Sequence, residues 1–379
     1  MNARLVILAL AILAVGLASY VLLGGEEDTG SWFIDLGEGE RLLDEPIPYI
    51  VDGRSVYLVV TSSRVVVIDA LDGSVVSETR LEGVNAGLGH RLEPLEVYVG
   101  KHSGGTLDIY RIYLDGLEPR IEGPILGGVN LWSSFSERGL WTATNDSLLF
   151  YPLPGLEPVR VESPLPFSDP ISVSAHSIGP FDTVSLVLKN ASSFTVIVDM
   201  TSGPEPVAVL RGYVVADTIS SERGFFLAAV SYSGDNIAEY SIEYIIDVIQ
   251  LEDDGRPRTF YSLSHRNAVN YPPAVEFYTD PLYLALLSVG PKSRTGNFSG
   301  TDPAVVIVER DGDTVALQYL ADLTGGLPPK TLWTPYTGLA NPIDFDGDGL
   351  VDVLASMRLY EGDEWRIRLV HLEMPPPGG

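Results

Sequence analysis

The hydrophobic positions of this chain fall into short runs of β-branched, aliphatic and aromatic residues. Clear examples are residues 56–60, 64–68, 195–198 and 305–308, and residues that favour turns follow each run within a few positions. Short apolar runs of this kind predict β-strands rather than helices. Because no convincing helical periodicity is found after residue 25, the pattern predicts an all-β fold.

One unit recurs along the chain, in which a strand runs into a tight turn containing Gly and a second strand follows. Dipeptides such as Asp-Gly supply the positive φ that a tight hairpin turn requires. The turn glycines are separated by 43, 39, 48, 52, 57 and 50 residues, and they are Gly73, Gly116, Gly155, Gly203, Gly255, Gly312 and Gly362. Such spacings indicate a β-propeller with about four strands per blade. The prediction is seven blades, with six or eight as alternatives and two packed sandwiches as a different possibility.

A short segment before the first unit also has strand character. Residues 32–36 read Trp-Phe-Ile-Asp-Leu and have no hairpin partner nearby in the sequence. A ring of sheets must close without leaving an exposed sheet edge. We therefore expect this segment to join the last blade and close the ring.

The N-terminal segment is the longest uncharged stretch of the chain. Residues 5–23 contain no charged side chain, Arg4 precedes them, and an acidic group follows at residues 26–28. This length is just sufficient for one membrane-spanning helix, and the positive-inside rule places the rest of the chain outside the cytoplasm. A cleaved signal peptide, which would give a secreted protein, is the alternative. The predicted organisation is an anchor or signal at 1–25, a propeller at 26–374 and a disordered Pro/Gly tail at 375–379.

Charge and composition exclude several classes of protein. The chain has 51 acidic and 24 basic residues, a formal net charge of −27, and no cysteine. A surface this acidic does not suit a nucleic-acid partner, because the phosphate backbone needs a basic surface. Without cysteine, disulfide scaffolds, thiolate metal sites and cysteine nucleophiles are excluded.

The motif with the most specific chemistry is the loop Asp-Phe-Asp-Gly-Asp-Gly-Leu-Val-Asp at residues 344–352. Calcium takes six to eight oxygen ligands, and alternating Asp residues on a turning loop can direct them at one centre. An EF-hand needs Glu at position 12, where this chain has Ala355, so that alternative fails. The predicted Ca²⁺ ligands are Asp344, Asp346, Asp348, the carbonyl of Leu350, and Asp352. A structural role in fixing the last blade is expected, because four unneutralised carboxylates in nine residues would otherwise repel one another.

Two resemblances follow from these motifs. The loop at 344–352, with a strand after it, resembles the calcium loops of integrin-α (FG-GAP) and VCBS-type propeller repeats. That resemblance covers one blade and implies a calcium-binding propeller. The segment 67–73 resembles the outer hairpin of quinoprotein-type propeller repeats; this implies the fold and not a quinone cofactor.

Other candidate chemistry is sparse. The histidines His90, His102, His176, His265 and His371 show no metal-binding spacing and are interpreted as loop or rim residues. No serine-nucleophile elbow or phosphate-binding loop is found, so no catalytic or cofactor-binding residue is predicted. Several aromatic residues are interpreted as core positions, namely Trp132, Trp141, Tyr271, Trp333 and Tyr336. Asn145, Asn190 and Asn297 are glycosylation sequons whose use the sequence does not decide.

These features predict a membrane-anchored, externally displayed propeller that is a calcium-stabilised binding or adhesion scaffold for a protein or glycan partner. Part of this prediction is analogy with proteins of the same fold. Two alternatives remain: an exported carbohydrate-active enzyme with carboxylates at the propeller centre, and an accessory subunit of a membrane complex. Acids and aromatics converging in a deep central pocket would favour the enzyme, whereas a flat face would favour the scaffold.

Overall fold

The computed structural model describes residues 30–232, 242–267, 273–289, 303–323, 332–339, 342–345, 347–361 and 364–376. The predicted membrane segment lies outside these residues. Among the helices of the described part, none is long and apolar enough to cross a membrane. The anchor therefore stays a prediction from the sequence.

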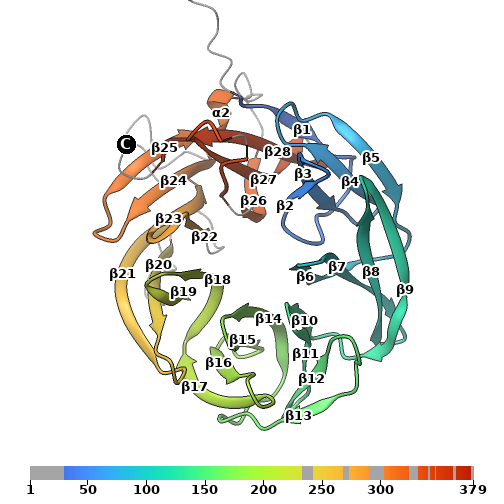
Figure 1. Ribbon diagram of the computed structural model, residues 1–379, viewed down its shortest axis with the longest axis vertical. Helices are drawn as coiled ribbons and strands as arrows, with labels where there is room; N and C mark the ends of the chain where they lie inside the picture. Colours follow the sequence, from blue (N-terminus) through green and yellow to red (C-terminus); the bar gives the residue numbers. More distant parts are fainter. Residues whose placement is uncertain are drawn as a thin grey trace, which may run out of the picture.

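Seven four-stranded antiparallel sheets are arranged as blades around a central axis (Figure 1). Strands are given from the axis outward. Blade 1 consists of β2 (Ile47–Val51), β3 (Arg54–Val60), β4 (Arg64–Asp69) and β5 (Val75–Arg80), and blade 2 of β6 (Ala86–Leu92), β7 (Leu95–Ser103), β8 (Thr106–Asp115) and β9 (Glu118–Val129). Blade 3 consists of β10 (Ser133–Ser136), β11 (Gly139–Ala143), β12 (Leu148–Pro152) and β13 (Val159–Val161).

The next three blades follow the same order. Blade 4 consists of β14 (Pro170–Ile178), β15 (Phe181–Leu188), β16 (Ser193–Asp199) and β17 (Glu205–Arg211), and blade 5 of β18 (Tyr213–Ser221), β19 (Gly224–Tyr232), β20 (Ile242–Leu251) and β21 (Pro257–Asn267). Blade 6 consists of β22 (Ala274–Tyr278), β23 (Asp280–Val289), β24 (Pro303–Glu309) and β25 (Thr314–Tyr319). The short helix α2 (Leu320–Leu323) follows β25. Blade 7 consists of β26 (Leu332–Leu339), β27 (Val351–Glu361), β28 (Glu364–Met374) and β1 (Phe33–Asp35). The prediction of a seven-bladed propeller is confirmed.

The N-terminal strand closes the ring, as the sequence predicts. β1 pairs with β28 in antiparallel register, with Ile34 opposite Leu369 and Asp35 opposite Arg368 (Figure 1). The Arg368 guanidinium binds the Asp35 carboxylate through two contacts, of 2.5 Å and 2.8 Å. The first described strand of the chain is therefore held in the last blade, where it forms the outer edge strand and gives this blade four strands like the other six.

The predicted turns fall at one place in six of the blades, between the third and fourth strands. Gly73 joins β4 to β5 with φ 70°, and Gly312 joins β24 to β25 with φ 84°. In blade 3 the positive φ is on Leu156 (53°). Gly362, the seventh predicted turn glycine, lies outside the described residues. Its place in the sequence is between β27 and β28, the second and third strands of blade 7, because the fourth strand of that blade is β1.

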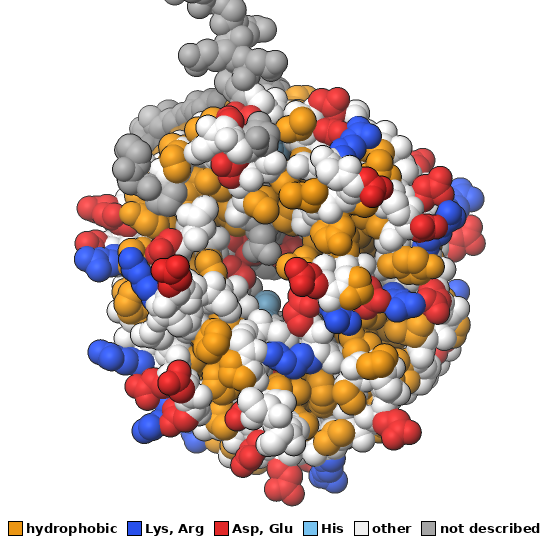
Figure 2. All heavy atoms as spheres, in the orientation of Figure 1, with side chains coloured by type: hydrophobic (Ala, Val, Ile, Leu, Met, Phe, Trp, Pro, Cys, Tyr) orange, Lys and Arg blue, Asp and Glu red, His pale blue; other side chains and the backbone are white. Residues whose placement is uncertain are grey.

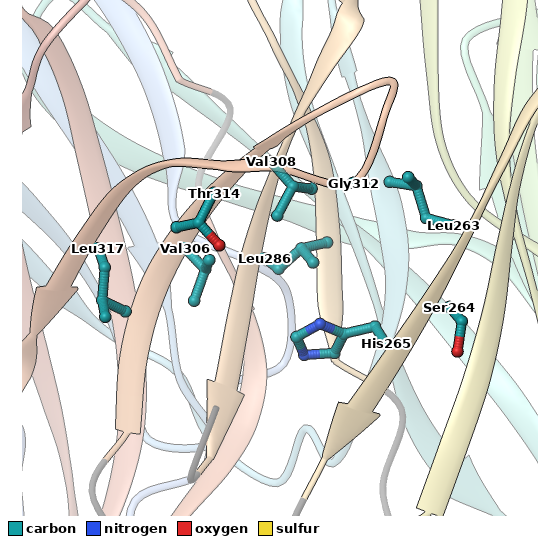
Figure 3. Close-up of a pocket in the computed structure, with 9 residues that line it drawn as sticks. All are labelled: Leu263, Ser264, His265, Leu286, Val306, Val308, Gly312, Thr314 and Leu317. Carbon is teal, nitrogen blue, oxygen red and sulfur yellow. The ribbon is translucent and has the colours of Figure 1, made fainter. Parts of the chain in front are cut away.

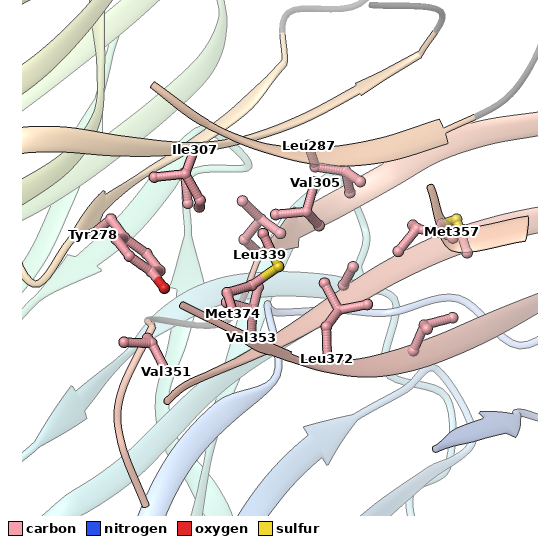
Figure 4. Close-up of a cluster of buried hydrophobic side chains, with 14 residues drawn as sticks. Tyr278, Leu287, Val305, Ile307, Leu339, Val351, Val353, Met357, Leu372 and Met374 are labelled. Atoms are coloured by element: carbon pink, nitrogen blue, oxygen red, sulfur yellow. The ribbon is translucent and has the colours of Figure 1, made fainter. Parts of the chain in front are cut away.

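The middle strands of the blades are buried on both faces, which explains why their sequences are continuous apolar runs. In β3, Val56 and Leu58 pack toward blade 2, whereas Tyr57 and Val59 pack with residues of blade 7. All four side chains have an exposure of 0%. Blades 6 and 7 pack in the same way, through side chains such as Leu287 and Leu372 (Figure 4). The core is thus a set of layers between neighbouring blades rather than one central cluster.

Candidate functional site: a polar central channel

The inner strands of blades 2 to 5 and the segment just before the inner strand of blade 1 line a cavity of about 410 Å³ at the centre of the ring. A hollow is visible there in the space-filling view, with acidic side chains and a histidine at its wall (Figure 2). The cavity lining is mainly polar and comes from five blades. Its ionisable residues are Asp44, Glu45, His90, Glu137, His176 and Asp217, and its serines are Ser133, Ser134, Ser136, Ser174 and Ser177. Glu276, on the inner strand of blade 6, lies against this group through its contact with Asp217.

The first pair in the channel is Asp44 with His90. Asp44 precedes β2, and its Oδ2 lies 3.2 Å from Nδ1 of His90 on β6, so the contact joins blade 1 to blade 2. Burial disfavours the charged imidazole, but the carboxylates of Asp44 and Glu45 outweigh this and raise the pKa of His90 to about 9. His90 and Asp44 therefore form an ion pair at neutral pH.

Glu45 is the carboxyl whose pKa lies nearest to neutral pH. Burial raises its pKa to about 7, and the negative charges of Asp44 and Asp217 add to this, while His90 acts in the opposite direction. Glu45 is therefore present in both protonation states at neutral pH. It can donate or accept a proton there.

Two carboxyl groups meet on the far side of the channel. Asp217 lies on β18 and Glu276 on β22, and their side chains are hydrogen-bonded. Burial raises the pKa of Asp217 to about 6, although hydrogen bonds from backbone N–H groups oppose the rise. Burial raises the pKa of Glu276 well above its ordinary range, and the charges of Asp217 and Glu45 raise it further.

His176, on β14, differs from His90 in its charge. Burial, together with the positive charge of His90, lowers its pKa to about 4, so it is neutral at pH 7. The nearby hydroxyl of Ser174 is buried and has no hydrogen-bond partner in the protein. In the neighbouring blade 3, Glu137 accepts a hydrogen bond of 3.0 Å from the N–H of Leu92, which links blades 2 and 3. The channel thus holds acids, a cationic imidazole and a neutral imidazole together.

The interpretation of the histidines as loop or rim residues is wrong for four of the five. His90 and His176 lie on inner strands, His265 lies on β21, and His371 lies in β28 with 1% exposure. The sequence did not reveal the channel, because each of the five blades contributes only one or two of its ionisable residues. The prediction of core aromatics is confirmed for Trp141, with 0% exposure, but not for Trp132, with 36%.

The predicted calcium loop lies at the start of β27, away from the channel lining. Asp344 accepts hydrogen bonds from the N–H groups of Gly347 (2.7 Å) and Gly349 (3.2 Å). Asp348 accepts one from Leu350 (2.7 Å). Asp346 lies outside the described residues. In the described part of the chain, no three acidic or histidine side chains form a group that would hold a metal ion.

Asp352, the last predicted ligand, points into the protein instead of toward the loop surface. Its Oδ1 lies 2.9 Å from Nε2 of His371, and its Oδ2 accepts a 2.7 Å hydrogen bond from the N–H of Phe345. The assumption that no basic group lies near the four carboxylates is therefore wrong for Asp352. Calcium at this loop stays a prediction, and the contact with His371 weakens the charge-repulsion argument for it.

A smaller cavity of about 120 Å³ lies between blades 5 and 6 (Figure 3). His265 points into it, and its Nε2 is 2.8 Å from the hydroxyl of Ser288. Burial lowers the pKa of His265 to about 4. Most of the other lining residues are aliphatic, and Ser288 has 0% exposure, so a substrate would not reach its hydroxyl. This histidine–serine contact is part of the packing between blades.

A larger hollow of about 1050 Å³ lies beside blades 4 and 5 and is lined mostly by apolar residues such as Leu165, Phe194 and Val214. Arg211 is the charged side chain among its described lining residues. Because it lacks converging acid and base groups, we regard the central channel as the better candidate site.

Comparisons with known proteins support the fold. No protein-family model matches the chain, and the search of curated proteins gives no match. Among solved structures, hydrazine synthase of Kuenenia stuttgartiensis has a TM-score of 0.50 at 13% identity, over 85% of this chain and 96% of that chain. The WD40 domain of SCAP from fission yeast has a TM-score of 0.39 at 10% identity, over 86% and 84% of the two chains. At 13% identity the likeness to hydrazine synthase concerns the fold alone, and no argument rests on the SCAP domain, whose TM-score is lower.

Proposed function

We propose that the protein is a binding propeller that receives its ligand in the central channel. The observation that supports this proposal is the convergence of ionisable and hydroxyl side chains from five blades on one cavity. Its volume of about 410 Å³ lies within the range of small-molecule sites. Such a cavity accommodates a small polar ligand or the end of a larger one.

The lining favours a neutral glycan as the ligand. The carboxylates and serines accept hydrogen bonds, and sugar hydroxyl groups donate them. The charge of Asp44 is balanced by His90, but Glu137, Asp217 and part of Glu45 leave the channel negative at neutral pH. An anionic sugar would be repelled. A basic side chain of a protein partner is the competing occupant.

A glycan array probed with the full chain in detergent tests this proposal. We expect binding to neutral glycans and none to sialylated or sulfated ones. Preferential binding to anionic glycans, or no glycan binding together with recovery of a stable protein partner from solubilised membranes, would contradict it.

The rest of the proposed function concerns where the propeller lies and what stabilises it. The uncharged segment 5–23 supports a single membrane anchor with the propeller outside the cytoplasm. Protease treatment of intact cells should degrade the propeller if this is correct, whereas full protection in cells and digestion only after lysis would contradict it.

The Asp-rich loop at 344–352 supports a bound Ca²⁺ that fixes the start of β27.

An exported enzyme that hydrolyses a glycan is the second candidate, and Glu45 favours it. A carboxyl with a pKa of about 7, beside an ion pair and a neutral imidazole, has the properties of a general acid or base. A glycan-hydrolysing site was also expected to contain aromatic side chains that stack on sugar rings. Phe135 is the aromatic residue among the described lining residues, and at 2% exposure it offers little surface for stacking. If the wild type hydrolyses members of a glycan panel and Glu45→Gln does not, the protein is a glycan hydrolase. If the wild type binds these glycans without hydrolysing them, hydrolase activity is excluded for that panel.

A further inference from the structure

The carboxyl groups of Asp217 and Glu276 join the inner strands of blades 5 and 6. Asp217 Oδ2 accepts a 2.7 Å hydrogen bond from the N–H of Phe277, across the boundary between the blades. Its Oδ1 accepts a 2.6 Å hydrogen bond from the N–H of Thr218. Both oxygens of Asp217 therefore act as acceptors, which an ionised carboxylate does best.

The hydrogen bond between the two carboxyl groups requires one proton, because two ionised carboxylates have no donor between them. Asp217 already accepts backbone N–H groups on both oxygens, so the proton belongs to Glu276. Glu276 is 5% exposed and is protected from water. Such a site favours the neutral acid.

We propose that Glu276 holds a proton at neutral pH and donates it in a hydrogen bond to Asp217. This hydrogen bond is a pH-sensitive lock: it holds the inner strands of blades 5 and 6 together at the wall of the central channel only while the proton is present. When the proton is lost, two buried carboxylates face each other. The lock does not depend on a ligand in the channel. Its failure would leave the proposed binding function untouched.

The charges around the pair favour retention of the proton. The groups that act on Glu276 are Asp217 on β18 and Glu45 before β2, and both are acidic. The cationic histidine of the described channel lining, His90 on β6, is paired with Asp44, while His176 on β14 is neutral at pH 7. The high pKa of Glu276 and the pKa of about 6 for Asp217 agree with this arrangement.

The pH dependence of stability follows from the raised pKa of Glu276. In the unfolded chain Glu276 ionises near its ordinary pKa of 4.5, whereas the folded protein keeps the proton to a much higher pH. Its contribution to stability is therefore complete below about pH 4.5 and decreases as the pH rises toward the folded-state pKa. Glu276→Gln should remove this dependence, because an amide stays neutral and can donate to Asp217.

Thermal melts of the full chain between about pH 5 and pH 9 test the lock. We expect Glu276→Gln to melt close to the wild type at the acid end and at least about 2 °C above it at the alkaline end. Glu205→Gln, which changes an exposed carboxyl on β17, should keep a constant difference from the wild type. A Glu276→Gln difference that does not change with pH would overturn the proposal.

Infrared spectroscopy gives a second readout that does not require Glu276→Gln to fold. In the Glu45→Gln variant at about pH 8, Glu276 should give the carbonyl stretch of a protonated carboxyl group. The absence of that band would overturn the proposal.

Asp217→Asn is expected to lower the melting temperature throughout the pH range, because Asn would direct an amide N–H at a backbone N–H.

Discussion

The indole ring of Trp32 lies flat against the imidazole of His371, with ring centroids 5.1 Å apart and planes within 7°. Trp32 comes just before β1 and His371 lies in β28, so the contact lies where the first and the last described strands pair. Trp32 Nε1 also donates a 2.9 Å hydrogen bond to the carbonyl of Ala70 in blade 1. One side chain therefore connects the closing strand, the last blade and the first blade.

Gly73 provides the first test of this junction. A Cβ at Gly73 would lie 2.6 Å from the Trp32 ring, whereas a Cβ at Gly53 would meet nothing within 4 Å; both residues have positive φ. We expect Gly53→Ala to cost about 1 kcal/mol of unfolding free energy, from the backbone alone. Gly73→Ala should cost about 2–4 kcal/mol, because Trp32 must also move. Equal losses in urea unfolding would show that Trp32 does not stabilise the closure.

His371 provides the second test. Its Nδ1 faces the carbonyl of Gly30 at 3.0 Å, and its Nε2 faces Asp352 at 2.9 Å. Replacing it with Gln leaves the buried Asp352 carboxylate without its basic partner, and we expect a loss of about 3 kcal/mol in unfolding free energy. His102→Gln, at an exposed position on β7, should change it by less than about 0.5 kcal/mol. A similar small effect at His371 would mean that its contacts contribute little.

The sequence predicted the ring because its signals are local. A turn such as the one at Gly312 lies between two apolar runs, and the blade-to-blade spacing repeats. Residues 32–36 could be placed in the last blade because a propeller must close. The lining of the channel could not be predicted from the sequence, because contacts such as that between Asp217 and the N–H of Phe277 join residues 60 positions apart. An acid or histidine in or beside an inner strand, such as Glu137 after β10 or His176 in β14, looks like any surface residue in the sequence.

The ion pair of His90 with Asp44 predicts a pH dependence opposite to that of a histidine buried in its neutral form, such as His176. The folded protein keeps the His90 proton to about pH 9, whereas the unfolded chain loses it near 6.5. Its contribution to stability is therefore complete below about pH 6.5 and disappears as the pH rises through about 9. The wild type should exceed His90→Gln in unfolding free energy near pH 6, and the difference should shrink toward pH 9. A difference that grows with pH would contradict the ion pair.

Calcium removal tests the Asp-rich loop. If Ca²⁺ binds there, saturating calcium should raise the melting temperature by about 5 °C over a chelated sample. Asp348→Asn should reduce that rise, while Asp253→Asn, at an exposed turn before β21, should leave it unchanged. Melts that do not respond to calcium in the wild type would mean that the loop is held by its own hydrogen bonds and by His371.

The central claim is that the channel of the propeller binds the ligand, and Glu45 tests it most directly. The measurement is the affinity of the full chain for the neutral glycan that gives the strongest array signal, compared among the wild type, Glu45→Gln and the exposed control Glu205→Gln. We predict that Glu45→Gln weakens binding about tenfold or more and that Glu205→Gln binds like the wild type. Equal affinities for all three proteins would contradict the account.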